Sequence, residues 1–185
     1  RTAAHLLRDR AAIEAGTLSG PPAVAPFVLP TRTFEGEMEF VLGDMPLRLI
    51  EADIHSDDAT VIWRREDALL LAGDTLEDTV TYVAEPKGFA NHLRDLARLA
   101  ALGPSTILPN HGCPDRIAAG GYPPAFIAAT ATYVRWLMDL RDNPDRAHTP
   151  LAEVIAPWLA DGTLLWFDGY DEVHAENIAA TLGHG

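Results

Sequence analysis

Three side chains that can bind a metal ion stand beside apolar runs of the sequence. His55 precedes one apolar run, Asp74 comes just after a second, and His111 follows a third. Neutral imidazole and carboxylate are usual ligands of zinc, and a carboxylate can also lie between two cations. These residues predict a metal site at the edge of a sheet, with one nitrogen each from His55 and His111 and a carboxylate from Asp74.

Each of the three residues also has an interpretation without a metal. A single histidine after a strand is more often a surface residue or one held by hydrogen bonds, and Gly73-Asp74 is an ordinary turn sequence. The order of the residues, and the apolar run beside each of them, favours a shared site over separate structural roles. Asp57 and Asp58 could then accept hydrogen bonds from His55 and orient its ring.

The elements around these residues predict an α/β protein. Alternation with period two predicts a hairpin over 38–52 and a second over 60–72, whose second strand is apolar on successive residues and is expected to be buried on both faces. Helical periodicity predicts helices over 88–102 and 123–141, with a short strand at 106–108 between them. Hairpins followed by helix, strand and helix are typical of a layered α/β sheet.

The two ends of the chain are predicted to be helical. Residues 2–15 form an amphipathic pattern that stops at Gly16, and a proline-rich connector follows. The tail should hold a helix near 150–160 that is interrupted at Pro157, and a last helix from Asp171, its cap, to Leu182. We therefore divide the chain into a leading helix with its connector (1–33), a central part (34–141) and a helical tail (142–185).

Composition and charge restrict the partners of the protein. The net charge of −13 disfavours nucleic acid, because a phosphate backbone needs a basic face. The sequence contains no apolar run near the roughly 20 residues that cross a bilayer. A single cysteine, Cys113, rules out a disulfide within the chain. A small-molecule substrate is the expected ligand, and the start at Arg1 suggests part of a longer protein.

The three segments, in this order, resemble the second half of a metallo-β-lactamase-fold hydrolase. In that family, one segment starts a hairpin and gives a ligand to the first metal, a strand end gives the bridging carboxylate, and another strand end gives a ligand to the second metal. The matching segments are His55-Ser56-Asp57-Asp58-Ala59-Thr60, Ala72-Gly73-Asp74 and Pro109-Asn110-His111-Gly112. The resemblance covers residues 34–140 and implies an αββα sandwich whose second half is present.

The resemblance also implies a chemistry. The complete protein would hold two divalent ions, expected to be zinc, and would use a metal-bound hydroxide on an ester, lactone, thioester or amide. His55 and His111 would be terminal ligands, and Asp74 would be the bridging ligand and the catalytic residue. The family's His-x-His-x-Asp-His motif is absent from this sequence. Since catalytic zinc usually has three protein ligands, we expect partial or no metal occupancy, and no activity, for this chain alone.

A non-catalytic protein is the alternative hypothesis. A fragment or degenerate homologue of this fold would present an open sheet, and open sheet edges pair with other chains. The chain would then form a homodimer or associate with a second polypeptide that carries the N-terminal half.

The remaining candidate residues have weaker support. His92 lies beside the apolar stripe of its helix and is expected to face solvent. His174 and Asn177 share a face of the last helix and are expected to be structural. Cys113 is close to His111 in the sequence and so should lie near the site. Three tyrosines in loops are candidate substrate contacts: Tyr82, Tyr122 and Tyr170.

Overall fold

The computed structural model describes residues 2–18, 23–83 and 86–183. The chain separates into two compact units, Arg1–Glu35 and Gly36–Gly185. The whole sheet and all three candidate metal ligands belong to the second unit.

The first unit consists of one helix and an irregular segment. Helix α1 (Thr2–Ala15) ends at Gly16, as predicted. Gly16 has a φ of +64°, a left-handed conformation that glycine adopts without steric cost at a helix end. The predicted connector has irregular backbone at Pro26 and Pro30, whereas its part at 21–22 lies outside the described residues.

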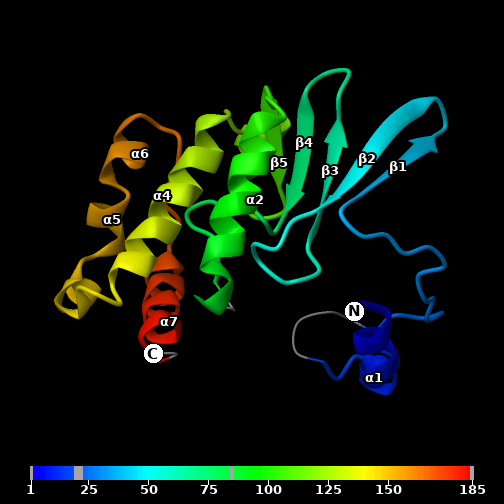
Figure 1. The fold of residues 1–185 in the computed structure, drawn as a ribbon, viewed down its shortest axis with the longest axis horizontal. Helices are drawn as coiled ribbons and strands as arrows, with labels where there is room; N and C mark the ends of the chain where they lie inside the picture. Colours follow the sequence, from blue (N-terminus) through cyan, green and yellow to red (C-terminus); the bar gives the residue numbers. More distant parts are fainter. Residues whose placement is uncertain (1, 19–22, 84–85, 184–185) are drawn as a thin grey trace. The chain divides into compact units, whose positions relative to one another are not determined.

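The second unit is built on one five-stranded sheet. The strands are β1 (Glu37–Leu42), β2 (Met45–Glu51), β3 (Thr60–Arg64), β4 (Leu69–Gly73) and β5 (Thr106–Pro109). They are arranged in the order β1-β2-β3-β4-β5, antiparallel as far as β4 and parallel between β4 and β5 (Figure 1). Both predicted hairpins and the predicted short strand are confirmed. Because β4 and β5 are parallel, the residues that follow them lie at the same edge of the sheet.

From β2 to β5, one face of the sheet meets the core and the other is half-exposed, whereas β1 is buried on neither face. Residues of the buried face pack into the hydrophobic core; they include Ile50, Val61, Trp63, Leu70, Ala72 and Ile107. The apolar residues between them on the same strands are of intermediate exposure; they include Leu49, Ile62, Leu69, Leu71 and Leu108. We call this second set the half-exposed face. The expectation that β4 is buried on both faces is therefore wrong, because only one of its faces meets the core of this unit.

Helices supply the rest of the core. The longer ones are α2 (Phe89–Ala101), α4 (Ala125–Asp139) and α7 (Tyr170–Gly183); the shorter ones are η1 (Pro86–Gly88), α3 (Pro114–Ala118), η2 (Pro144–His148), α5 (Leu151–Val154) and α6 (Ala156–Ala160). Helix α2 packs against α4, and α4 packs against α7 (Figure 1). Among the described helices, none combines the length and the apolar character needed to cross a bilayer. The predicted α/β class is confirmed.

The helices of the tail differ from the expectation in two details. The break falls at Ile155, between α5 and α6, and Pro157 lies in the first turn of α6. Proline is tolerated there because the first turn has no hydrogen-bond partner for the missing N–H. Helix α7 begins at Tyr170, so that Asp171 lies inside its first turn instead of capping it. A carboxylate in that turn still interacts favourably with the helix dipole.

Candidate functional site

The structure brings two of the three predicted ligands together. Asp74 directly follows β4, and His111 follows β5 after one intervening residue, at the edge that these parallel strands share. The Nε2 atom of His111 lies 3.4 Å from Oδ1 of Asp74. The two segments are joined beside this pair, because the amide of Asn110 donates a hydrogen bond of 3.0 Å to the carbonyl of Gly73. The edge of the sheet therefore carries an imidazole and a carboxylate in contact.

The third predicted ligand, His55, contacts a residue that the sequence did not indicate. His55 lies in the loop between β2 and β3, and its Nδ1 is 3.5 Å from Oε1 of Glu77. Burial raises the pKa of Glu77 to about 8, and the charge of Asp74 adds to this increase. Glu77 thus contacts His55 and also interacts with the charge of Asp74. No motif in the sequence marks Glu77; it is only close to Asp74 along the chain, three residues later.

The donor atoms at this edge partly fit a divalent metal. Both Nδ1 of His55 and Oδ1 of Asp74 are buried and lack a hydrogen-bond partner, since their contacts with Glu77 and His111 do not have hydrogen-bond geometry. Buried polar atoms without partners are costly, and imidazole and carboxylate are zinc ligands. Within the described parts of the chain, however, no three His, Cys, Asp or Glu residues are grouped closely enough to hold an ion. The site has two pairs of donors and not a complete ligand set.

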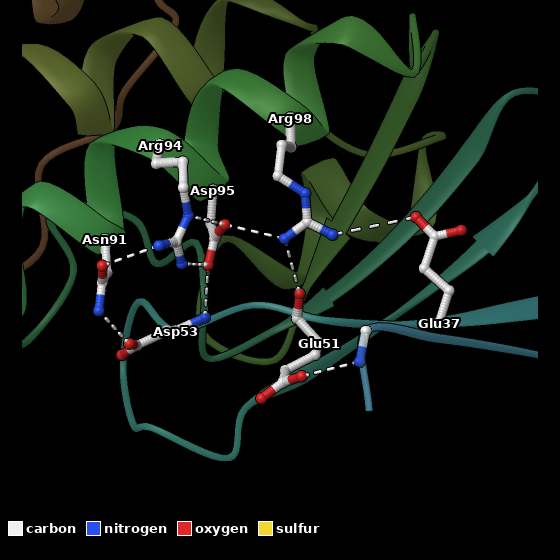
Figure 2. A network of polar contacts seen from close by, with 8 residues as sticks. Glu37, Glu51, Asp53, Asn91, Arg94, Asp95 and Arg98 are labelled. Carbon is white, nitrogen blue, oxygen red and sulfur yellow. Dashed lines mark hydrogen bonds and ion pairs between the residues drawn. The ribbon is translucent and has the colours of Figure 1, made fainter. Parts of the chain in front are cut away.

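A polar network centred on the buried carboxylate of Asp95 holds the loop that carries His55 (Figure 2). Asp95 of α2, whose side chain is 3% exposed, accepts a hydrogen bond of 3.0 Å from the amide of Asp53 and further hydrogen bonds from Arg94 and Arg98. Burial alone would raise the pKa of Asp95, but these hydrogen bonds lower it below its ordinary value. Asn91 donates to the Asp53 carboxylate at 2.7 Å. Helix α2 therefore anchors the chain two residues before His55.

His92 is buried, so the expectation that it faces solvent is wrong. Its exposed fraction is 2%, and burial lowers the pKa of its ring. The imidazole lies nearly perpendicular to the ring of Phe89, with the centroids 5.8 Å apart, and the loop at Asp53 contacts Asn91 of the same helix. The buried surface of α2 is therefore wider than its apolar stripe, because the loop at Asp53 also buries His92. This contact could not be read from the periodicity of one helix.

His174 and Asn177 belong to a buried network, which supports their structural interpretation. The hydroxyl of Tyr133 lies 2.9 Å from Nδ1 of His174, and Nε2 of His174 lies 3.1 Å from the carbonyl of Thr149. Asn177 accepts a hydrogen bond of 2.7 Å from the amide of Val83 and donates to the carbonyl of Thr81. Helix α7 is thereby fastened to the segment that follows Asp74.

The predicted substrate contacts have different environments. Tyr82 is 37% exposed, and its ring centroid lies 6.3 Å from that of His55. Tyr170 is half-buried, and burial raises its pKa to about 12, with contributions from the charges of Glu77 and Asp78. Tyr122 is only 1% exposed, so its prediction as a substrate contact is wrong. Its ring fills the core instead of a loop surface. Cys113 is half-buried at the start of α3.

Comparisons with known proteins find similarity at the level of structure only. A scan against models of protein families found no match, and a search of curated proteins found none. Among solved structures, a metallo-beta-lactamase family protein from Thermus thermophilus matches with 22% identity and a TM-score of 0.47, over 95% of this chain and 56% of that one. A beta-lactamase domain protein from Burkholderia ambifaria matches with 20% identity and a TM-score of 0.49, over 85% of this chain and 47% of that one.

A third match is a metallo-beta-lactamase from Pontibacter korlensis, with 17% identity and a TM-score of 0.46, over 71% of this chain and 61% of that one. The chain spans about half the length of the solved structures that it matches. Its fold, a mixed sheet with helices, is similar to part of these metallo-beta-lactamase and beta-lactamase domain proteins. The roles of individual residues rest on the contacts described above.

Proposed function

We propose that this chain forms part of the metal centre of a metal-dependent hydrolase, with His55, Asp74 and His111 as ligands. The observation that carries the proposal is the contact of 3.4 Å between His111 and Asp74 at the shared edge of β4 and β5. The buried Oδ1 of Asp74 has no hydrogen-bond partner, and a cation would supply the missing interaction. The resemblance of the three sequence segments supports the same assignment.

In this function each residue has a separate task. Asp74 would lie between two ions and is the catalytic residue of the proposal, while His55 and His111 would each bind one ion through a ring nitrogen. Zinc ions held there would lower the pKa of water and so activate it toward an ester, lactone, thioester or amide of a small molecule. Each ion would then have only two protein ligands, one histidine and the shared Asp74. Catalytic zinc usually has three, so further ligands must complete the centre.

Metal analysis tests the proposal. The protein, in a form that extends beyond these 185 residues, would be purified and its zinc content measured by mass spectrometry, alongside the variants Asp74→Ala and Asp44→Ala. Asp44 is exposed in the turn between β1 and β2 and serves as the matched control. We expect Asp74→Ala to lower zinc content and abolish hydrolysis, and Asp44→Ala to change neither. A longer protein that binds no divalent metal would refute the proposal.

The half-exposed face supports a second candidate function, association with another chain. Five apolar residues of adjacent strands, from Leu49 to Leu108, lie outside the hydrophobic core among the described residues. Contiguous apolar patches of this kind commonly mark interfaces. The proposed partner is a second copy of the chain or a polypeptide that adds a complementary layer.

Light scattering after size-exclusion chromatography tests this association. We expect the chain to form a dimer and expect Ile62→Lys, on the half-exposed face, to disrupt it. Val41→Lys changes an apolar residue of β1 that is 66% exposed and provides the control. A stable monomer without metal at micromolar concentration would contradict self-association.

A further inference from the structure

We propose that Tyr122 is a positioning residue for His111, and that its hydroxyl fastens the turn that carries His111 to the buried ring beside β5. The inference rests on the proposed function in one respect only, namely that His111 is a metal ligand. It assigns to Tyr122 a role that none of the three sequence segments includes.

The tyrosine is fixed in place by its surroundings. Its backbone pairs with Ile107 of β5 through hydrogen bonds of 3.0 and 2.8 Å. Its ring stacks on Phe126 with the centroids 4.5 Å apart, and the guanidinium of Arg116 lies 4.9 Å from the ring centroid. A buried ring packed against these two groups has little rotamer freedom. The position of its hydroxyl is therefore set relative to β5.

The hydroxyl of Tyr122 contacts the turn that carries His111. It accepts a hydrogen bond of 2.8 Å from the amide of Cys113. A Cβ atom placed on Gly112 would lie 2.6 Å from the same hydroxyl oxygen, which is closer than such contacts occur. The residue after His111 must therefore be glycine as long as Tyr122 occupies this place. The turn at Gly112 therefore packs against the Tyr122 ring in addition to its hydrogen bond through Cys113.

The same hydroxyl reaches the segment after Asp74. It lies near the carboxylate of Asp78, because burial raises the pKa of Tyr122 and this carboxylate adds to the increase. The same carboxylate accepts a hydrogen bond from the amide of Leu165 at 2.9 Å. The backbone amide of Asp78 donates to the carbonyl of His111 at 3.2 Å. The amide of Asp78, four residues after Asp74, thus links the two segments directly, and Tyr122 holds the amide of Cys113, two residues after His111.

The main chain at His111 is consequently held on both sides. On one side, the amide of Asn110 bonds to Gly73, and on the other the amide of Cys113 bonds to Tyr122. Between these two anchors the carbonyl of His111 accepts the hydrogen bond from the amide of Asp78, so its backbone is restrained. Partners behind metal ligands that fix their orientation typically change metal affinity by about 10- to 100-fold when removed. Tyr122 acts in this way through the backbone instead of through the imidazole ring.

The test compares Tyr122→Phe with Tyr133→Phe in the 185-residue chain. Tyr133 is also a buried tyrosine with two hydrogen bonds, but these go to His174 and Asn177. Zinc affinity would be measured by competition with a chelator at pH 7. We expect Tyr122→Phe to weaken zinc binding about tenfold and Tyr133→Phe to change it by less than about twofold.

A double-mutant cycle separates positioning from loss of structure. In the His111→Ala background, Tyr122→Phe should have no further effect on zinc affinity, because the side chain that it positions is gone. Equal losses in both backgrounds, or equal losses for Tyr122→Phe and Tyr133→Phe, would overturn the proposal.

Hydrogen exchange decides the inference even if the chain binds no zinc. In that case the proposed function loses support. The role of Tyr122 is then tested by the hydrogen-exchange rates of the amides of residues 110–113. We expect Tyr122→Phe to accelerate exchange there by about tenfold or more, while Tyr133→Phe leaves it unchanged. Exchange in 110–113 that is the same in both variants would refute the role of Tyr122 independently of any metal.

Discussion

Replacing Glu77 with glutamine should change how the stability of the protein depends on pH. Glu77 is 7% exposed, and burial together with the charge of Asp74 raises its pKa from 4.5 to about 8. Between these two values, the folded protein holds a proton on Glu77 that the unfolded chain releases. The folded state therefore binds more protons, and stability must fall as the pH rises from 4.5 toward 8.

The size of the effect follows from the same two values. Each pH unit in this interval costs up to about 1.4 kcal/mol of unfolding free energy, and the whole interval amounts to about 5 kcal/mol. Glutamine has nearly the same shape as protonated glutamic acid and does not ionise. We therefore expect Glu77→Gln to match the wild type near pH 4.5 and to become progressively more stable than it up to pH 8.

Urea denaturation at pH 5, 6.5 and 8 in the presence of a chelator measures the effect. Other titrating groups contribute equally to the variant and the wild type, so they cancel when the two unfolding free energies are subtracted. Glu176→Gln, at an exposed position of α7, controls for the loss of one acidic side chain. A difference that stays constant across the three pH values would show that Glu77 is ionised in the folded protein, and would refute the reasoning.

Two further substitutions and one titration test the networks around the site. Asp95→Ala leaves the half-buried amide of Asp53 without its partner and should cost about 1–3 kcal/mol of stability, measured by urea denaturation, with faster hydrogen exchange in the loop of His55. Asn177→Ala removes the partners of the Val83 amide and the Thr81 carbonyl and should cost about 2–5 kcal/mol in the same assay. Burial lowers the pKa of His174, so stability from this residue is lost as the pH falls below 6.5; ring titration followed by NMR should show a midpoint below 6.5 for His174. A normal midpoint would contradict the buried assignment.

The sequence indicated the strands well because each carries its own pattern. Both hairpins, the strand before His111 and the helix 88–102 have local periodicity, and the structure places all of them within two residues of the expectation. The approach of Asp74 to His111 was also predictable, since residues after adjacent parallel strands share an edge. These are consequences of pattern and topology, which a sequence displays directly.

The partners of the site residues could not be predicted in the same way. Glu77 has no motif, and its contact with His55 depends on the path of the chain after Asp74. Tyr122 looks like any polar aromatic residue beside Pro123 until β5 pairs with it and buries its ring. His92 is enclosed by a loop whose position depends on Asp95, three residues along the same helix. Each of these contacts joins distant segments, and single-sequence periodicity contains no information on such pairings.

The two proposals for this protein can be connected by thermodynamic linkage. The donor set among the described residues of the sheet edge is incomplete, and the half-exposed face lies outside the described hydrophobic core of the unit Gly36–Gly185. If one partner layer supplies both the cover and the additional ligands, zinc and association must strengthen each other by the same factor. We expect zinc to raise the dimer fraction seen by light scattering, and Ile62→Lys to weaken zinc binding although it touches no donor atom. If association and zinc affinity vary independently, the layer and the ligands come from different sources, and the half-exposed face has a role separate from the metal centre.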